Sequence, residues 1–180
     1  KTIDDFRNFY KPKKEQEEFD VLDSFARVKA LIKAQLDHNE IEVHIDKRCE
    51  NSRVVGHKNE FEQSILNLLT NSKDAILEKR AEHPKDHFTG AIQVIVDRVD
   101  NGLYIEIGDN GSGIAKEARE RLFEPYFTTK EGSKGTGIGL YMSKMMIENG
   151  MGGTIYFKEN VKEGAVAVIN IPENNGELIG

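Results

Sequence analysis

Apolar residues recur at helical spacing in two long segments of the chain. Over residues 22–38, one helical face carries the apolar side chains of Phe25, Val28, Leu31, Ile32 and Leu36. A second predicted helix, over residues 59–80, has an apolar stripe formed by Phe61, Ile65, Leu68, Leu69 and Ile76. Between the two helices, the alternating segment IEVHID predicts a strand over residues 41–46.

The rest of the pattern predicts two pairs of strands. The segments AIQVIVDRV and LYIEIGD flank Asp100, Asn101 and Gly102, a typical hairpin turn. A helix over residues 138–148 precedes the segments GTIYFKE and AVAVINIP, with a turn at Gly164 between them. This order predicts an α+β fold: a two-layer sandwich with helices on one face of a mixed, largely antiparallel sheet.

Composition excludes several classes of function. The 180 residues carry a formal net charge of -6, so there is no global basic field of the kind that nucleic-acid binding requires. No stretch approaches the roughly 18 apolar residues of a membrane span, and the N-terminus has no signal-peptide pattern. The single cysteine, Cys49, excludes an internal disulfide, so we expect a soluble chain in a reducing compartment, the cytoplasm.

The second predicted helix carries a polar stripe beside its apolar one. Asn67, Asn71 and Asp74 follow one another at i, i+4 and i+7 and therefore share a face. Asn and Asp are mediocre helix formers, so this stripe indicates a role other than helix formation. Asn71 offers a neutral oxygen of the kind that Mg²⁺ accepts while it bridges substrate phosphates.

The segment DNGSGI, residues 109–114, permits two interpretations. It is either a hairpin turn or a loop in which glycines let the backbone approach a flat ligand. The preceding strand already has its hairpin partner, and the following AKEARERL has a helical pattern, which argues against a second hairpin. In a ligand loop, Asp109 accepts a hydrogen bond from an exocyclic amine such as that of adenine, and Gly111 and Gly113 admit the ring.

Residues 123–137 show little periodicity and predict a mobile lid that ends in GTGIGL. Glycines expose backbone N–H groups, and the helix that follows offers its N-terminus to an anion. Such a loop alone is a weak signal, because most Gly-rich loops bind nothing. Together with an amine acceptor and a metal oxygen, however, it indicates a nucleotide and its metal.

Four segments carry a family resemblance. NLLTNSKDAI, DNGSGI, FEPYFTTK and GTGIGL resemble, in order, the N, G1, F and G2 boxes of the sensor histidine kinase catalytic domain. That domain belongs to the superfamily of gyrase, mismatch-repair and heat-shock chaperone ATPases. The resemblance covers roughly residues 19–172 and implies a Bergerat-type fold with an ATP lid. It also implies transfer of the ATP γ-phosphate to a histidine on a phosphoacceptor domain that is missing from this chain.

The resemblance also implies residue roles. Asn71 is the expected Mg²⁺ ligand, and Asn67, Asn71 and Arg121 are the expected catalytic residues, although Arg121 equally fits a solvated helix charge. Lys73 or Lys130 is expected to supply the basic group that many members carry where this chain has Asp74. The expected ATP-binding residues are Asn71, Lys73, Asp109, Gly111, Gly113, Ile114, Phe123, Thr129, Lys130, Gly135, Thr136, Gly137, Ile138, Gly139 and Leu140.

Asn67 separates the kinases from their hydrolytic relatives. Gyrase-like members carry a glutamate at this position, where it activates water, whereas an asparagine is no general base. Phosphoryl transfer needs mainly positioning and charge neutralisation, so a kinase can do without that acid. Two alternatives stay open: a nucleotide-sensing interaction module and a hydrolytic ATPase of the same superfamily.

The first residues add a prediction about the parent protein. Ile3, Phe6 and Tyr10 have helical spacing up to Pro12, either as an ordinary N-terminal helix or, as the resemblance implies, as the end of the dimerisation and phosphoacceptor hairpin. We therefore expect a boundary between residues 1–18 and a catalytic domain over 19–180. The implied partners are that hairpin, a response regulator receiver domain and a second copy in a homodimer, with no nucleic acid and no direct membrane contact.

Overall fold

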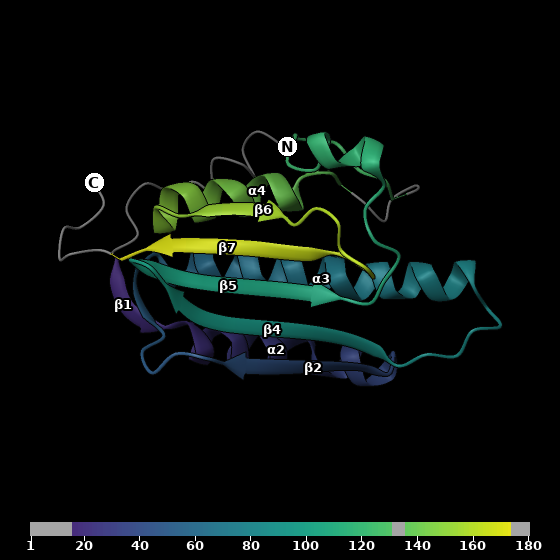
Figure 1. Cartoon of the computed structure of the whole chain (residues 1–180), viewed down its shortest axis with the longest axis horizontal. Coiled ribbons are helices and arrows are strands. Elements are labelled where there is room, and N and C mark those ends of the chain that lie inside the picture. The colour runs from purple at the N-terminus through teal and green to yellow at the C-terminus, as the bar shows by residue number, and fades with distance from the viewer. Residues whose placement is uncertain (1–15, 131–135, 174–180) are drawn as a thin grey trace.

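The computed structural model describes residues 16–130 and 136–173, which build a layer of helices on a five-stranded sheet (Figure 1). The strands run in the order β2, β4, β5, β7, β6. Their bounds are Ile41–Lys47 for β2, Gly90–Val99 for β4, Gly102–Asp109 for β5, Thr154–Phe157 for β6 and Val166–Pro172 for β7. Only β2 and β4 pair in parallel, which confirms the predicted mixed, largely antiparallel sheet.

The hairpin between β4 and β5 forms at the predicted turn. Val99 pairs with Gly102, so Asp100 and Asn101 make the connection, and Asp100 adopts a φ of 52°. Alternate residues of both strands face the helices and are fully or almost fully buried. These inward side chains are Ile92, Val94, Val96, Leu103, Ile105 and Ile107.

Three helices cover one face of the sheet: α2 (Val21–His38), α3 (Lys58–Glu82) and α4 (Gly139–Met145) (Figure 1). Asp20 caps α2, because its carboxylate accepts the Leu22 N–H at 2.9 Å. Both long helices confirm the predicted pattern, but Leu31 is 70% exposed and does not belong to the buried stripe. It is about 100° around the helix from Ile32, beyond the edge of that stripe.

The core lies between α2, α3 and the sheet. Phe61, Ile65, Leu69 and Ile76 of α3 have no exposed surface. The ring of Phe61 meets that of Phe25 edge-on, with 6.2 Å between centroids. Burial of this stripe fixes the rotation of α3 and turns its polar stripe toward the opposite side.

Three further features differ from the sequence prediction. Strand β1 (Glu17–Asp20) pairs antiparallel with β3 (Arg53–Gly56) in a separate small sheet that the pattern did not reveal. The helix predicted over 138–148 is α4 followed by a π-helical turn, η3 (Met146–Gly150). The helical segment after DNGSGI is a 3-10 helix, η1 (Lys116–Arg121).

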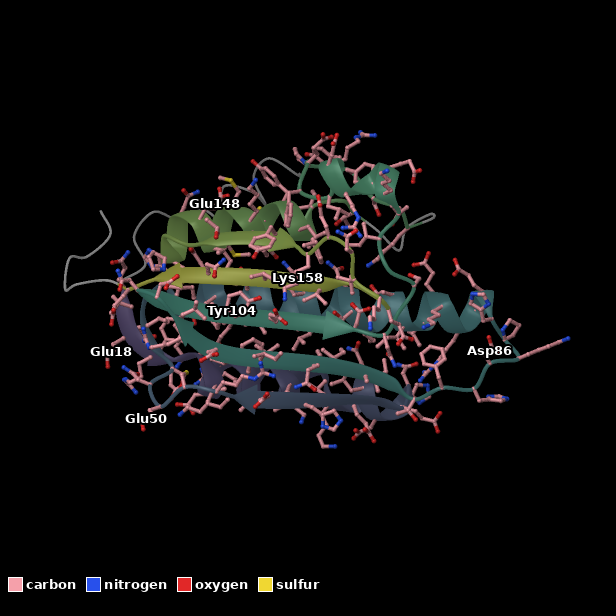
Figure 2. All side chains as sticks on the ribbon, viewed as in Figure 1. Glu18, Glu50, Asp86, Tyr104, Glu148 and Lys158 are labelled. Carbon is pink, nitrogen blue, oxygen red and sulfur yellow. The ribbon has the colours of Figure 1, made fainter. Side chains whose placement is uncertain are left out.

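The open face of the sheet carries a polar cluster where Figure 2 labels Tyr104 and Lys158. The Tyr104 hydroxyl and the Lys158 ammonium both donate to the Glu106 carboxylate. Burial opposes ionisation of Glu106, but these hydrogen bonds outweigh it and hold the pKa of the carboxyl below its ordinary value. The Glu106 carboxylate therefore stays ionised on a face that no described helix covers.

The predicted helix of residues 1–10 lies outside the described residues, so the proposed boundary at residues 18 and 19 stays a prediction. Within the described ranges, no helix combines the length and apolar character needed to cross a bilayer.

Candidate nucleotide-binding site

A cavity of about 340 Å³ lies beside α3, between the carboxyl end of β5 and the residues that lead into α4. Its wall contains eleven of the residues expected to act in catalysis or nucleotide binding. They are Asn67, Asn71, Asp109, Gly113, Ile114, Thr129, Lys130, Thr136, Gly137, Gly139 and Leu140. Segments far apart in the sequence therefore meet at one site, as the ordered motifs predicted.

The polar stripe of α3 forms one wall of this cavity. Asn67, Asn71 and Asp74 all line it, which confirms that they share a face. Lys130 crosses from the other side, and its ammonium is 2.6 Å from Asp74 Oδ2 and 3.3 Å from Asn71 Oδ1. The side-chain amide of Asn67 donates to the Gly139 carbonyl oxygen at 3.3 Å and to Ser143 Oγ at 3.2 Å.

Asp109 ends β5 at the cavity and starts the DNGSGI loop. Its carboxylate accepts the Gly111 N–H at 2.9 Å. Burial raises the pKa of Asp109 above its ordinary value, and the hydrogen bonds from Gly111 and Ser72 oppose this shift without cancelling it. The segment is no second hairpin, because η1 follows it. A partly buried acceptor with a raised pKa, at a loop of glycines, suits recognition of a donor on a flat ring.

Three glycines allow the backbones around the cavity to approach closely. Gly113, Gly137 and Gly164 have φ values of 78°, 69° and 65°, a region that favours glycine. A Cβ on Gly164 would overlap the backbone carbonyl of Asp109. A Cβ on Gly111 would come within 2.6 Å of the Ala75 backbone carbon, so this glycine packs against α3 rather than lining the cavity.

Four residues of the GTGIGL segment form part of the cavity wall. Thr136, Gly137, Gly139 and Leu140 line the cavity, and α4 begins at Gly139. Gly137 is held in place by the other end of the lid segment, because its carbonyl oxygen accepts the Tyr126 N–H at 2.8 Å. Gly135 lies outside the described residues, and Ile138 does not line the cavity.

Three other expected residues lie outside the cavity wall. Lys73 donates to Gln35 Oε1 at 2.9 Å, on the α2 side of α3. Arg121 pairs with Glu124 at 3.1 Å and lies over the Phe127 ring, with its guanidinium 4.5 Å from the centroid. Phe123 stacks on Phe157 at 5.7 Å between centroids. Phe127 and Phe157 do line the cavity, so Arg121 and Phe123 contact it through their neighbours.

Several cavity residues had no prior signal in the sequence. Ser72 lies one residue past Asn71, is 6% exposed and hydrogen-bonds Asp109. Glu78 lines the wall and accepts from Ser112 Oγ at 3.2 Å. Ala167 of β7 and Ala165, the residue just before that strand, also line the cavity, and the small size of these two side chains was the only available hint.

The residues present fit a nucleotide with its metal. The cavity volume falls in the range of small-molecule sites, and its wall combines an acid, amides, hydroxyls and glycine backbone. Among the described residues, no group of three or more His, Cys, Asp or Glu could hold a metal alone. Asn71 nonetheless suits Mg²⁺ that arrives with phosphates, because such an ion takes few protein ligands and keeps its waters.

Comparison with known proteins identifies the family. Residues 56–175 match the family of histidine kinase-, DNA gyrase B- and HSP90-like ATPases, and the chain belongs to it. Over 154 residues the chain is 34% identical to the two-component sensor PprA of Pseudomonas aeruginosa, and over 129 residues it is 34% identical to the C4-dicarboxylate transport sensor protein DctB of Rhizobium meliloti. These matches cover 86% and 72% of this chain but only 16% and 19% of the relatives.

The catalytic domain of the histidine kinase ThkA has the same fold. Its structure superposes with a TM-score of 0.75 and 26% identity, covering 89% of this chain and 97% of that domain. Together with the sensor kinases among the relatives, this similarity defines an ATP-binding catalytic domain of the histidine kinase type. A gyrase-like hydrolase is not favoured.

Asn67→Ala is expected to weaken binding of an ATP analogue by about fivefold, the equivalent of one lost hydrogen bond. The variant loses the contact from α3 to Gly139 and Ser143 that fixes the start of α4. Gln63→Ala is the matched control, since Gln63 contacts the opposite end of the same amide at 3.5 Å and does not line the cavity. Equal calorimetric affinities for Asn67→Ala and wild type would show that Asn67 does not position the start of α4 for nucleotide binding.

Asp109→Asn is expected to raise the melting temperature of the nucleotide-free protein at neutral pH. The pKa of Asp109 is higher in the folded chain than its ordinary value of 3.8, so the ionised carboxylate opposes folding. This effect grows as pH rises through the raised pKa and disappears as pH falls below the ordinary value. Melting temperatures of wild type and Asp109→Asn should be measured over this pH range. A difference between them that widened as pH fell would contradict the expectation.

Proposed function

We propose that this chain binds Mg-ATP in the cavity and transfers the γ-phosphate to a histidine of a separate phosphoacceptor hairpin. The supporting observation is the convergence of Asp109, Asn71, Gly137 and Gly139 on one cavity in a chain of the histidine kinase type. In the transfer, the histidine nitrogen bonds to the γ-phosphorus while the bond to the ADP oxygen breaks.

The site favours transfer over hydrolysis. Asn67 is the first polar residue of the α3 stripe, and its amide already donates to Gly139 and Ser143. An amide cannot take a proton from water at neutral pH, so this position supplies no general base. The acceptor histidine must supply the nucleophile, and the domain supplies position and charge neutralisation.

Roles within the site follow from this placement. Asn71 would hold Mg²⁺, which neutralises charge on the phosphates, and Asp109 would accept the adenine amine. Gly137 and Gly139 leave room for the phosphates beside the start of α4. Arg121 would have to leave Glu124 and Phe127 to reach the γ-phosphate, so its catalytic role requires a movement.

We further infer that the parent protein is a dimeric two-component sensor whose partners are its own hairpin and a response regulator. PprA is a two-component sensor, and ThkA has been solved in complex with the response regulator protein TrrA. Because ATP and receiver domains are cytoplasmic, we place this domain in the cytoplasm, with no nucleic-acid partner and no direct membrane contact.

The test uses γ-labelled ATP and the parent protein from the hairpin onward. Acid-labile, base-stable label should appear on the hairpin, and the Asp109→Asn variant should not produce it. A nucleotide-sensing module would bind ATP without labelling the hairpin. Rapid phosphate release by the chain alone would instead indicate a hydrolase.

A further inference from the structure

A lysine ammonium stands at the two α3 oxygens that face the cavity. Lys130 Nζ is 3.3 Å from Asn71 Oδ1 and 2.6 Å from Asp74 Oδ2, and all three residues line the cavity. The two oxygens project from successive turns of α3, at i and i+3, so a single cation can contact both. A cation already lies at the oxygen that we assign to Mg²⁺.

Asp74 also contacts a second lysine, which lies on the α2 side of α3. Lys73 Nζ is 3.6 Å from Asp74 Oδ1, and it donates to Gln35 on α2. Lys73 neither lines the cavity nor contacts Asn71 in the described structure. The two lysines therefore share one carboxylate, but only Lys130 occupies the metal oxygen.

We propose that Lys130 and the nucleotide-bound Mg²⁺ compete for Asn71 and Asp74, so that metal binding displaces the ammonium into the cavity. This inference rests on the proposed function. Without metal, Lys130 neutralises Asp74 and occupies the amide oxygen of Asn71. When Mg-ATP binds, the ion takes the Asn71 oxygen, and the ammonium moves away from that oxygen into the cavity.

The ion pair is weak enough to exchange. The side chains of Lys130 and Asp74 are each 31% exposed, so solvent screens their attraction. Such a pair contributes up to about 1 kcal/mol, which corresponds to about fivefold in an equilibrium constant. Competition is reciprocal, so removing the ammonium must favour the metal by the same factor.

The experiment compares Lys130→Met with Lys73→Met in the intact chain. Calorimetry with a nonhydrolysable ATP analogue at a series of free Mg²⁺ concentrations gives the Mg²⁺ midpoint and the affinity at saturating Mg²⁺. Lys130→Met should lower the midpoint by about fivefold and strengthen the affinity at saturating Mg²⁺ by about the same factor, since it removes the competitor that the bound metal must displace. Lys73→Met, which removes an equal charge from the same carboxylate, should change neither quantity.

The outcomes separate this inference from the proposed function. An unchanged or higher midpoint in Lys130→Met, or equal shifts in both variants, with normal binding by wild type, would overturn the competition alone. Absence of analogue binding by wild type at every Mg²⁺ concentration would overturn the proposed function and this inference with it.

Discussion

Asp109→Asn is expected to weaken binding of an adenine nucleotide by about 100-fold, the equivalent of a charge-assisted hydrogen bond. The carboxylate ends β5 at the cavity, partly buried and held by the Gly111 N–H. An asparagine keeps the shape and one acceptor but removes the charge, and its NH₂ group can face the adenine amine as a second donor. Calorimetric titration with an ATP analogue measures the loss.

Two controls make this result specific. Glu78→Gln removes a charge from the same cavity wall, where Glu78 is exposed and contacts only Ser112 in the described structure, so affinity should change little. Wild type should also prefer ATP over GTP, because guanine presents a carbonyl oxygen where adenine presents its amine. Wild-type affinity in Asp109→Asn, or equal losses in both variants, would show that Asp109 does not read the base.

Gly164→Ala is expected to destabilise the fold by about 3 kcal/mol and also to weaken nucleotide binding. Gly164 has a φ of 65°, and a Cβ there would overlap the Asp109 carbonyl. The chain must move the β6–β7 turn away from β5 to relieve this contact. That movement disturbs the hydrogen bond from the Asp109 N–H to the Ala165 carbonyl, 3.0 Å long in wild type.

Gly139→Ala is the matched control for stability. A Cβ at Gly139 meets nothing nearer than Asn67 Cγ at 3.9 Å, and the residue begins a helix, where alanine is favoured. Denaturant titration should therefore show a large loss for Gly164→Ala and little or no loss for Gly139→Ala. Similar stabilities for the two variants would mean that the β6–β7 turn adapts freely.

The sequence predicted the long elements because their patterns are regular. Helices α2 and α3 repeat their apolar residues over several turns, and Asn101-Gly102 marks the β4–β5 hairpin. Strands β1 and β3 escaped prediction because EEFD and RVVG are four residues long and too short to show alternation. Leu31 was misplaced because spacing alone does not locate the edge of a buried stripe.

The motif residues of the site were easier to predict than the neighbouring residues that hold them in place. Glycines, Asp109 and the α3 asparagines are unusual for the elements that contain them, so each stands out in the sequence. Ser72 and Ala165 are ordinary residues whose role depends on which strands and loops become neighbours. The contact of Asn67 with Gly139 crosses 72 residues of chain, and no local pattern encodes such a pairing.

The central claim is tested most directly by titrating the chain with a nonhydrolysable ATP analogue, with Mg²⁺ and with EDTA. We predict one binding site whose affinity is clearly higher with Mg²⁺ and is lost in Asp109→Asn. No binding by the folded wild-type chain, or binding that neither EDTA nor Asp109→Asn affects, would contradict the assignment of this cavity to Mg-ATP.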